Sequence, residues 1–293
     1  MGRPASTRDS VDSRLQQRFD ELTPAERQLA SVLLEHYPMA GLSSITELAS
    51  RADVSTPTVV RCAKKLGFDG FVAMQRAIRD EVEATLRDPI GRRATWQGGT
   101  EYGHLVDRFA EATASNVANT LRRLDRQVFD QVVEKVSAEH SRIFITGGRI
   151  TRSIADYLFN HLQIIRPGVT ELGTSSNIWP QYVVDMDDSA VVLLFDIRRY
   201  ESDLHKLARL CAERNATLVL FTDQWGSPIA RLADHRFDTL VEVPSPWDST
   251  LAMMLLVECL IAAVQDRHWP ASKERIQTLE TMFGKTRLFR RFD

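Results

Sequence analysis

Apolar residues in the first part of the chain recur at helical spacing. The pattern predicts helices over about 11–21, 24–37, 44–52, 55–66 and 71–86. In the fourth of these, Val59, Cys62, Ala63 and Leu66 follow the i, i+3, i+4, i+7 rule and must face a core. The first 85 or so residues are therefore expected to form a small all-helical domain.

The spacing of apolar residues changes after about residue 140, where short apolar runs alternate with stretches of helical periodicity. Strands are predicted at 142–146, 169–172, 190–195, 217–222 and 239–243, and helices at 152–164, 176–186, 202–214 and 227–234. A long helix, apolar nearly all round, is predicted at 249–266. Strands that are apolar throughout and separated by helices indicate a parallel sheet covered on both faces.

Residues 44–67 have the form of a helix-turn-helix. Ser44 and Glu47 are spaced as a capping box for the first helix. Residues 53–55 form a short turn, after which Ser55 is positioned to cap the second helix and Pro57 lies in its first turn. Gly67 ends that helix, as a left-handed residue would.

The second helix has an outer face that suits the DNA major groove. No acidic residue occurs between Ser55 and Phe68. A short helix with small residues at its start and cations on its outer face is typical of a DNA-reading helix. The expected DNA-contacting residues are Ser55, Thr56, Pro57, Thr58, Arg61, Lys64 and Lys65. The alternative is an ordinary solvated helix in a small bundle.

Charge and composition narrow the picture further. The net charge is −2, and residues 1–90 carry 12 basic and 13 acidic side chains, a balance of −1. A basic footprint can therefore only be local, and placing two such helices on one duplex requires at least a homodimer. No apolar run approaches the ~20 residues of a membrane span, and the polar N-terminus does not resemble a secretory signal. Three widely spaced cysteines are typical of buried thiols, so a cytoplasmic protein without membrane contact is expected.

The N-terminal region resembles a known family over residues 11–85. The matching segments are LTPAER at 22–27, ITELA at 45–49, VS at 54–55, TVVR at 58–61 and KLGFDGF at 65–71. They are similar to the DNA-binding domain of RpiR-type transcriptional regulators. The last segment is the specific one, because a generic helix-turn-helix would not carry it. The resemblance implies operator DNA as a partner.

Residues of about 125–270 resemble a SIS (sugar isomerase) domain, which RpiR-type regulators carry in this position. The typical segments are AERNAT at 212–217, TD at 222–223, SPIA at 227–230 and AD at 233–234. The expected fold is a helical domain followed by an α-β-α sandwich with a five-stranded parallel sheet. The expected bounds are a tail at 1–10, the DNA-binding domain at 11–87, a linker at 88–104, the SIS-like domain at 105–270 and a C-terminal tail or helix at 271–293.

A ligand of such a sheet sits beyond the carboxyl ends of the strands, where helix N-termini attract anions. The turn after the first strand holds Gly147, Gly148, Arg149 and Thr151; in SIS domains it usually reads Gly-x-Gly-x-Ser, and Arg149 replaces the second glycine. After the second strand, Ser175 and Ser176 supply two hydroxyl groups. These hydroxyls either bind an anion or cap the next helix.

The turn after the third strand departs from the family pattern. SIS domains that bind phosphosugars usually carry Ser-x-Ser-Gly-x-Thr there, and this chain has Asp196-Ile197-Arg198-Arg199-Tyr200-Glu201 instead. Asp196, Arg198 and Arg199 are therefore candidate effector residues, with the two arginines clamping an anion. Solvated surface arginines are the alternative. A phosphosugar and an organic acid both fit such a site.

Three functions fit these observations. The first is a DNA-binding regulator whose SIS-like domain senses a small anionic metabolite and oligomerises as a homodimer or homotetramer. The second is a sugar-phosphate isomerase, for which Glu258 and His161 are conceivable bases outside any matched motif. The third is a ligand-free scaffold that uses the SIS fold to oligomerise. The first is favoured, with no catalytic residues, metal or cofactor expected; operator, effector and the direction of regulation are not encoded in any recognisable pattern.

Overall fold

The computed structural model describes residues 11–85 and 103–287. The chain folds as two compact units, whose main boundary lies between residues 102 and 103. The predicted tail at 1–10 and nearly all of the predicted linker at 88–104 lie outside the described residues.

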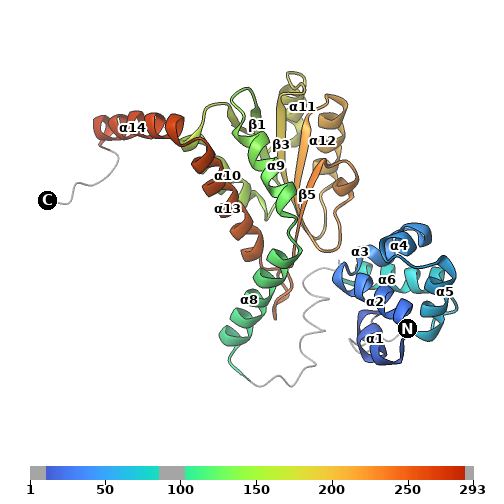
Figure 1. Ribbon diagram of the computed structural model, residues 1–293. Helices are drawn as coiled ribbons and strands as arrows, with labels where there is room; N and C mark the ends of the chain where they lie inside the picture. Colours follow the sequence, from blue (N-terminus) through green and yellow to red (C-terminus); the bar gives the residue numbers. More distant parts are fainter. Residues whose placement is uncertain (1–10, 86–102, 288–293) are drawn as a thin grey trace. The chain divides into compact units, whose positions relative to one another are not determined.

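The first unit is all helical, as the periodicity predicts (Figure 1). Its core is made by apolar side chains from every helix, including Leu15, Leu29, Leu48, Val59 and Met74, all without exposed surface. The elements are α1 (Val11–Gln17), η2 (Phe19–Glu21), α2 (Pro24–Glu35), α3 (Met39–Leu42), α4 (Ile45–Arg51), α5 (Thr56–Lys65) and α6 (Phe71–Thr85).

Local signals fix several of these helix ends, whereas the predicted cap Ser55 makes no side-chain capping hydrogen bond at the start of α5. Thr23 and Glu26 form the capping box of α2, and the Ser44 hydroxyl accepts a hydrogen bond from the N–H of Glu47 at the start of α4. Gly67 follows α5 with φ of +90°, a conformation that favours glycine. The short helix α3 was not predicted, because four residues are too few to show a helical period.

The second unit is a parallel five-stranded sheet with the strand order β2-β1-β3-β4-β5. The predicted α/β architecture is therefore confirmed. The strands are β1 (Arg142–Gly147), β2 (Val169–Glu171), β3 (Ala190–Asp196), β4 (Thr217–Asp223) and β5 (His235–Thr239). The helices are α8 (Leu105–Arg123), α9 (Arg126–Ser137), α10 (Arg152–Ile165), α11 (Trp179–Val183), α12 (Ser202–Glu213), α13 (Leu251–Arg267) and α14 (Trp269–Thr286), with the short η3 (Ser176–Ile178) and η4 (Pro228–Arg231).

Helices cover both faces of the sheet (Figure 1). On one face, α9, α10 and α13 pack on side chains such as Ile145, Leu193 and Phe221. On the other face, α11, α12 and η4 pack on the alternate residues, such as Val192 and Leu220. The strand β3 is buried along its whole length at the centre of the sheet. Because it lies between β1 and β4, its carboxyl end lies between the turns that follow those two strands.

Some predicted elements differ from the structure. The fifth strand is His235–Thr239, not 239–243, because an edge strand with alternating exposure has few consecutive apolar residues to mark it. The predicted helices at 176–186 and 227–234 are the short η3 with α11, and η4. The C-terminal segment given as tail or helix is the helix α14 as far as Thr286. In the described part of the chain, no helix is long and apolar enough to span a membrane.

Candidate DNA-binding helix and effector site

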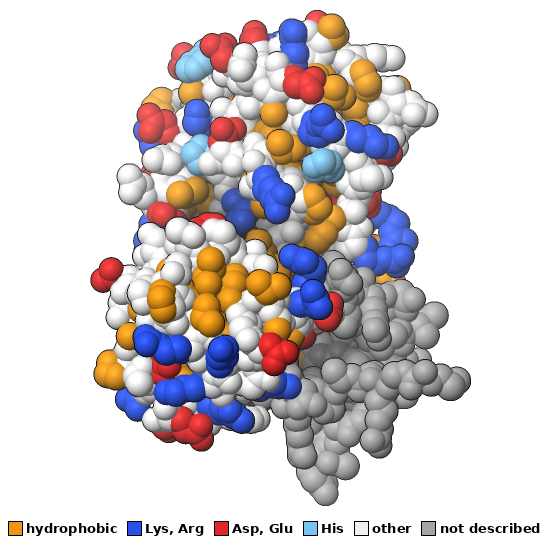
Figure 2. All heavy atoms as spheres, turned by 90° about the vertical axis from the view of Figure 1, so that its right-hand side faces the viewer, with side chains coloured by type: hydrophobic (Ala, Val, Ile, Leu, Met, Phe, Trp, Pro, Cys, Tyr) orange, Lys and Arg blue, Asp and Glu red, His pale blue; other side chains and the backbone are white. Residues whose placement is uncertain are grey.

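The helix α5 buries one side and exposes a cationic one. Val59, Cys62 and Ala63 have no exposed surface, whereas Arg61 and Lys64 point outward. Ser55, Thr56, Pro57 and Lys65 are also exposed. Figure 2 views the helical unit from the side on which Figure 1 places α5, and lysine and arginine side chains gather there around an apolar patch with a few acidic groups among them.

One predicted DNA contact, Thr58, is not on the exposed side. It is only 5 % exposed. Its hydroxyl oxygen lies 2.9 Å from the Ser55 hydroxyl and accepts a hydrogen bond from the Arg61 guanidinium at 3.2 Å. Thr58 lies one turn before Cys62 on the same side of α5, so the helical period that buries Cys62 buries Thr58 as well. Thr58 therefore orients Arg61 instead of presenting its own side chain.

The exposed Lys65 side chain already has partners within the protein. Its ammonium group lies 2.6 Å from the buried Glu26 carboxylate and also donates to the carbonyl oxygen of Glu21 at 3.4 Å. Burial opposes ionisation of Glu26, but hydrogen bonds from Lys65 and from the Thr23 N–H lower the pKa of Glu26 below its ordinary value. This ion pair ties the end of α5 to the start of α2.

In the second unit, the turn after β1 is tied to the neighbouring strand β3. The Gly148 N–H and the Thr151 hydroxyl both donate to the carbonyl oxygen of Phe195, at 3.0 Å and 2.7 Å. A Cβ on Gly147 would lie 2.9 Å from the backbone of Thr151, so only glycine permits this close approach. Gly147 and Thr151, both predicted effector residues, thus build the turn and are buried in it.

The backbone of the same turn already binds a carboxylate. The N–H of Arg149 donates to Oε1 of Glu201 at 2.6 Å. Glu201 lies just before α12 and is exposed, and the Arg149 side chain is exposed as well. The Arg149 N–H, two residues before the N-cap Thr151 of α10, therefore already holds an anionic group, and that group belongs to the chain itself.

The turn after β3 is held by two buried carboxyl groups. Asp196 accepts hydrogen bonds from the Ser227 hydroxyl at 2.5 Å and from the N–H of Glu201 at 3.3 Å. Asp223 accepts from the N–H of Arg198 and from the Tyr200 hydroxyl, both at 2.6 Å. Burial raises the pKa of Asp196 and that of Asp223 to about 6, although these hydrogen bonds act in the opposite direction.

Of the two predicted arginines in this turn, only one faces solvent. The Arg198 side chain is 4 % exposed, forms an ion pair with Asp248 at 2.9 Å and lies 3.6 Å from Glu242. Its guanidinium carbon is 3.6 Å from the centre of the Trp225 ring. These partners follow β4 and β5, so Arg198 turns away from the β1 side. Arg199 is exposed and has a left-handed φ of 68°.

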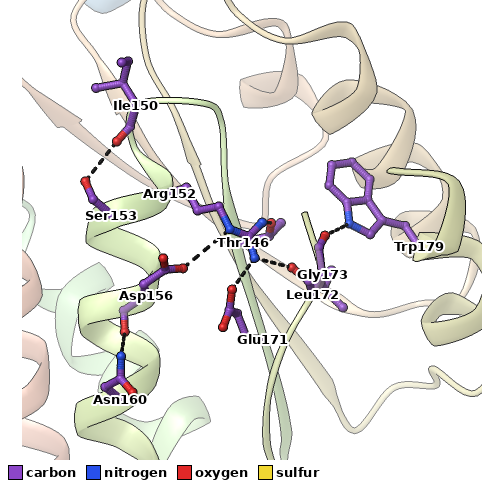
Figure 3. A network of polar contacts seen from close by, with 10 residues as sticks. All are labelled: Thr146, Ile150, Arg152, Ser153, Asp156, Asn160, Glu171, Leu172, Gly173 and Trp179. Atoms are coloured by element: carbon purple, nitrogen blue, oxygen red, sulfur yellow. Dashed lines mark hydrogen bonds and ion pairs between the residues drawn. The ribbon is translucent and has the colours of Figure 1, made fainter. Parts of the chain in front are cut away.

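On the β2 side, Arg152 organises a third cluster of polar groups (Figure 3). Its guanidinium contacts the Glu171 carboxylate, donates to the carbonyl oxygen of Leu172 at 2.8 Å and lies 3.6 Å from Asp156. Nearby, Ser175 is exposed, whereas the Ser176 hydroxyl donates to Asp203 at 2.8 Å. The carboxyl edge of β1 and β2 thus combines the Arg149 turn with an exposed serine.

Residues that the sequence did not single out carry much of this site. Asp248 and Trp225 contact the Arg198 guanidinium, Asp223 accepts from the Arg198 backbone N–H, and Glu201 accepts from the Arg149 N–H. Asp223 and Ser227 belong to segments typical of SIS domains, which was the available signal. No sequence signal pointed to Trp225 and Asp248, because the residue that they contact, Arg198, follows a different strand, β3. Among the described residues, no group of three or more His, Cys, Asp or Glu side chains could hold a metal ion.

Comparison with known proteins agrees with both units. The helix-turn-helix domain of the rpiR family matches residues 10–85, and the SIS domain matches residues 136–263. The transcriptional regulator HexR of Pseudomonas aeruginosa is 26% identical over 254 residues, which cover 86% of this chain and 85% of HexR. An uncharacterised HTH-type transcriptional regulator of Haemophilus influenzae is 22% identical and covers 74% of this chain and 75% of its own.

Solved structures share the fold. Vibrio vulnificus NanR, solved with ManNAc-6P, superposes with a TM-score of 0.54 at 17% identity and covers 94% of this chain and 99% of NanR. The sugar isomerase domain of an RpiR transcription factor from Sphaerobacter thermophilus gives 0.55 at 19% identity, over 61% of this chain and 99% of that one. With both domain families matched in order along one chain, this protein belongs to the RpiR-type transcriptional regulators, which join a helix-turn-helix domain to a SIS domain.

Proposed function

We propose that α5 reads an operator in the DNA major groove and that the SIS unit binds a small anionic metabolite that changes operator binding. The observation that carries the DNA half is the outer face of α5, where Arg61 and Lys64 are exposed and no acidic residue intervenes between Ser55 and Phe68. Regulation, and not isomerase catalysis, is supported by relatives that match most of the chain and are named transcriptional regulators.

The proposed DNA contacts divide into two groups. Ser55, Thr56, Pro57, Arg61 and Lys64 are exposed and available to bases and phosphates. Thr58 acts through Arg61, because its hydroxyl accepts a hydrogen bond from the Arg61 guanidinium. Lys65 reaches a phosphate only by leaving Glu26. An arginine held in one orientation in the middle of such a helix suits the bidentate recognition of guanine.

The test is retardation of DNA from the region upstream of the protein's own gene. Arg61→Ala and Lys64→Ala are compared with wild type at several salt concentrations. A lost phosphate contact should lower the salt slope by about one, and a lost base contact should cost ~1–3 kcal/mol and relax specificity. Arg79→Ala, which removes an exposed arginine from α6, is the matched control. Unchanged binding by both α5 variants would mean that another element reads the DNA.

The proposed effector site lies at the carboxyl edge of β1 and β2. Its supports are the Arg149 N–H, which holds a carboxylate, and the exposed side chains of Arg149 and Ser175. NanR, which shares the fold, is bound to a phosphosugar in its solved structure. In this chain the turn after β3 is filled by the Asp196 and Arg198 contacts, so the anionic group of the effector is assigned to the β1 turn instead.

A thermal-shift screen tests this assignment. Phosphosugars, including ManNAc-6P, and organic acids are added to the full chain. A true effector should stabilise the protein by about 2.7 kcal/mol at a hundredfold excess over its dissociation constant. Arg149→Ala keeps the backbone N–H but removes the guanidinium, so it should reduce the shift, whereas Arg209→Ala, which removes an exposed arginine from α12, should retain it. A hit whose shift is unchanged in Arg149→Ala would place the pocket elsewhere, and a broad screen without hits would favour the scaffold function.

A further inference from the structure

We propose that the Glu201 carboxylate is a built-in competitor for the anionic group of the effector and so determines which anions the SIS unit accepts; this inference rests on the effector site proposed above. The Arg149 N–H, which an incoming anion would use, is held by Oε1 of Glu201 at 2.6 Å. The chain thus carries a negatively charged group in the place where its ligand is expected.

The position of the carboxylate is defined by its close approach to the turn. A Cβ built on Gly148 would lie 3.0 Å from Oε1 and 3.2 Å from Cδ of Glu201. The carboxylate therefore fills the space directly above Gly148 that an anion bound to the Arg149 N–H would occupy. A second anion cannot enter beside it, because the two like charges would repel at that distance.

The Glu201 backbone is fixed, but its side chain is free to leave. Its N–H donates to Asp196 at 3.3 Å, and its carbonyl oxygen accepts from the N–H of His205 in the first turn of α12. The side chain itself is exposed. Rotation of the carboxylate into water therefore needs no movement of the fold and keeps the ion hydrated.

This arrangement selects among anions. A small anion such as inorganic phosphate makes only the contacts that Glu201 loses, and it must displace a negatively charged group that stays attached beside the turn. A larger molecule that also contacts the Arg149 side chain or Ser175 gains additional free energy for that exchange. Glu201 therefore excludes inorganic phosphate and admits an anionic group carried on a larger polar molecule.

Inorganic phosphate is the probe that tests this proposal. Its dissociation constant is measured by titration calorimetry and thermal shift, at constant ionic strength, on the full-length wild type, Glu201→Gln and Glu201→Ala. Phosphate should bind Glu201→Ala at least tenfold more tightly than wild type, with Glu201→Gln between them, because glutamine keeps an acceptor but loses the charge. Glu213→Gln removes an exposed acid from the other end of α12 and should bind phosphate as wild type does.

A second variant locates the gain. In Gly148→Ala/Glu201→Ala the new Cβ enters the space left by the carboxylate, so the tighter binding of phosphate should disappear. Equal affinity of wild type and Glu201→Ala, a gain that survives Gly148→Ala, or no phosphate binding by any variant would each overturn the competitor role. Operator retardation by the wild-type protein, which needs no phosphate, tests the regulator function separately.

Discussion

Asp196 is a buried carboxyl group whose pKa makes stability depend on pH. Burial raises its pKa to about 6, above the value of ~3.9 expected in the unfolded chain. Between these values the folded state holds a proton that the unfolded state has released. The free energy of unfolding contributed by Asp196 is therefore greatest below pH 4, falls as the pH rises to about 6, and is constant above it.

Asp196→Asn should remove this dependence. Asparagine keeps the size of the side chain and can still bond the Ser227 hydroxyl and the Glu201 N–H. The difference in unfolding free energy between wild type and variant should change by about 2 kcal/mol from pH 4 to pH 7, in the direction that disfavours wild type at the higher pH. Urea unfolding at intermediate pH values measures it, and a difference that is the same at every pH would refute the argument.

Gly147 is required for a contact between backbones. The Cβ of an alanine would lie 2.9 Å from the Thr151 carbonyl group and 3.0 Å from the Arg152 nitrogen, which cannot move without displacing the start of α10. Gly147→Ala should destabilise the SIS unit by about 1–3 kcal/mol. Gly284→Ala, where nothing lies within 4 Å in the helix α14, is the control and should be neutral or stabilising by up to ~1 kcal/mol. Equal thermal stability of the two variants would contradict this role.

Residue-scale prediction from the sequence succeeded where a local rule fixes the backbone. Gly67 ends α5, and Ser44 caps α4, because each depends only on neighbouring residues. Side-chain destinations were less accessible. From the sequence, Arg198 could either bind a ligand or lie in solvent. Its actual partners Asp248 and Trp225 come from turns that only the folded sheet brings together.

At the scale of elements, α2 and α5 are joined through Glu26. Its carboxylate accepts from the Thr23 N–H in the capping box and pairs with Lys65. Glu26→Gln keeps the capping acceptor but removes the ion pair, which is partly exposed on the lysine side, and should cost under about 1 kcal/mol. Glu26→Ala also leaves the cap unmade and should cost about 1–2 kcal/mol.

Urea unfolding of the helical unit separates these two steps. Glu35→Gln, an exposed acid at the other end of α2, should leave stability unchanged. If Glu26→Gln were as destabilising as Glu26→Ala, the ion pair and not the capping box would account for the contribution of Glu26 to stability.

Element prediction depended on how many residues carry the period. The long helix α13 and the buried strands β3 and β4 were found within a few residues of their ends. The fifth strand was displaced, because TLVEV at 239–243 is more apolar than the true edge strand at 235–239, where only Phe237 and Thr239 are buried. The helix α3 and the short η3 and η4 are below the length at which a period is visible.

At the scale of the whole molecule, the long helix α13 leaves apolar side chains on the surface. One side packs on the sheet through Met253, Leu256 and Leu260, but Leu251 is 54% exposed and Ala262, three turns on, is exposed as well, with Glu258 exposed between them. Exposed apolar residues at the two ends of one open side are a candidate contact for a second copy of the chain. Since the helical unit carries few cations for DNA, a second copy of this chain would also double its phosphate contacts.

We therefore predict a homodimer held by the SIS unit through α13. Leu251→Lys/Ala262→Lys places two charges in the predicted interface and should shift sedimentation from dimer toward monomer at micromolar concentration. Operator affinity should fall at least tenfold, because a monomer presents one α5 where the two-fold duplex site needs two. Leu210→Lys, 38% exposed on α12 over the opposite face of the sheet, should remain dimeric and bind the operator normally. A wild type that sediments as a monomer would rule out the dimer, and a dimeric double variant would place its interface on another surface.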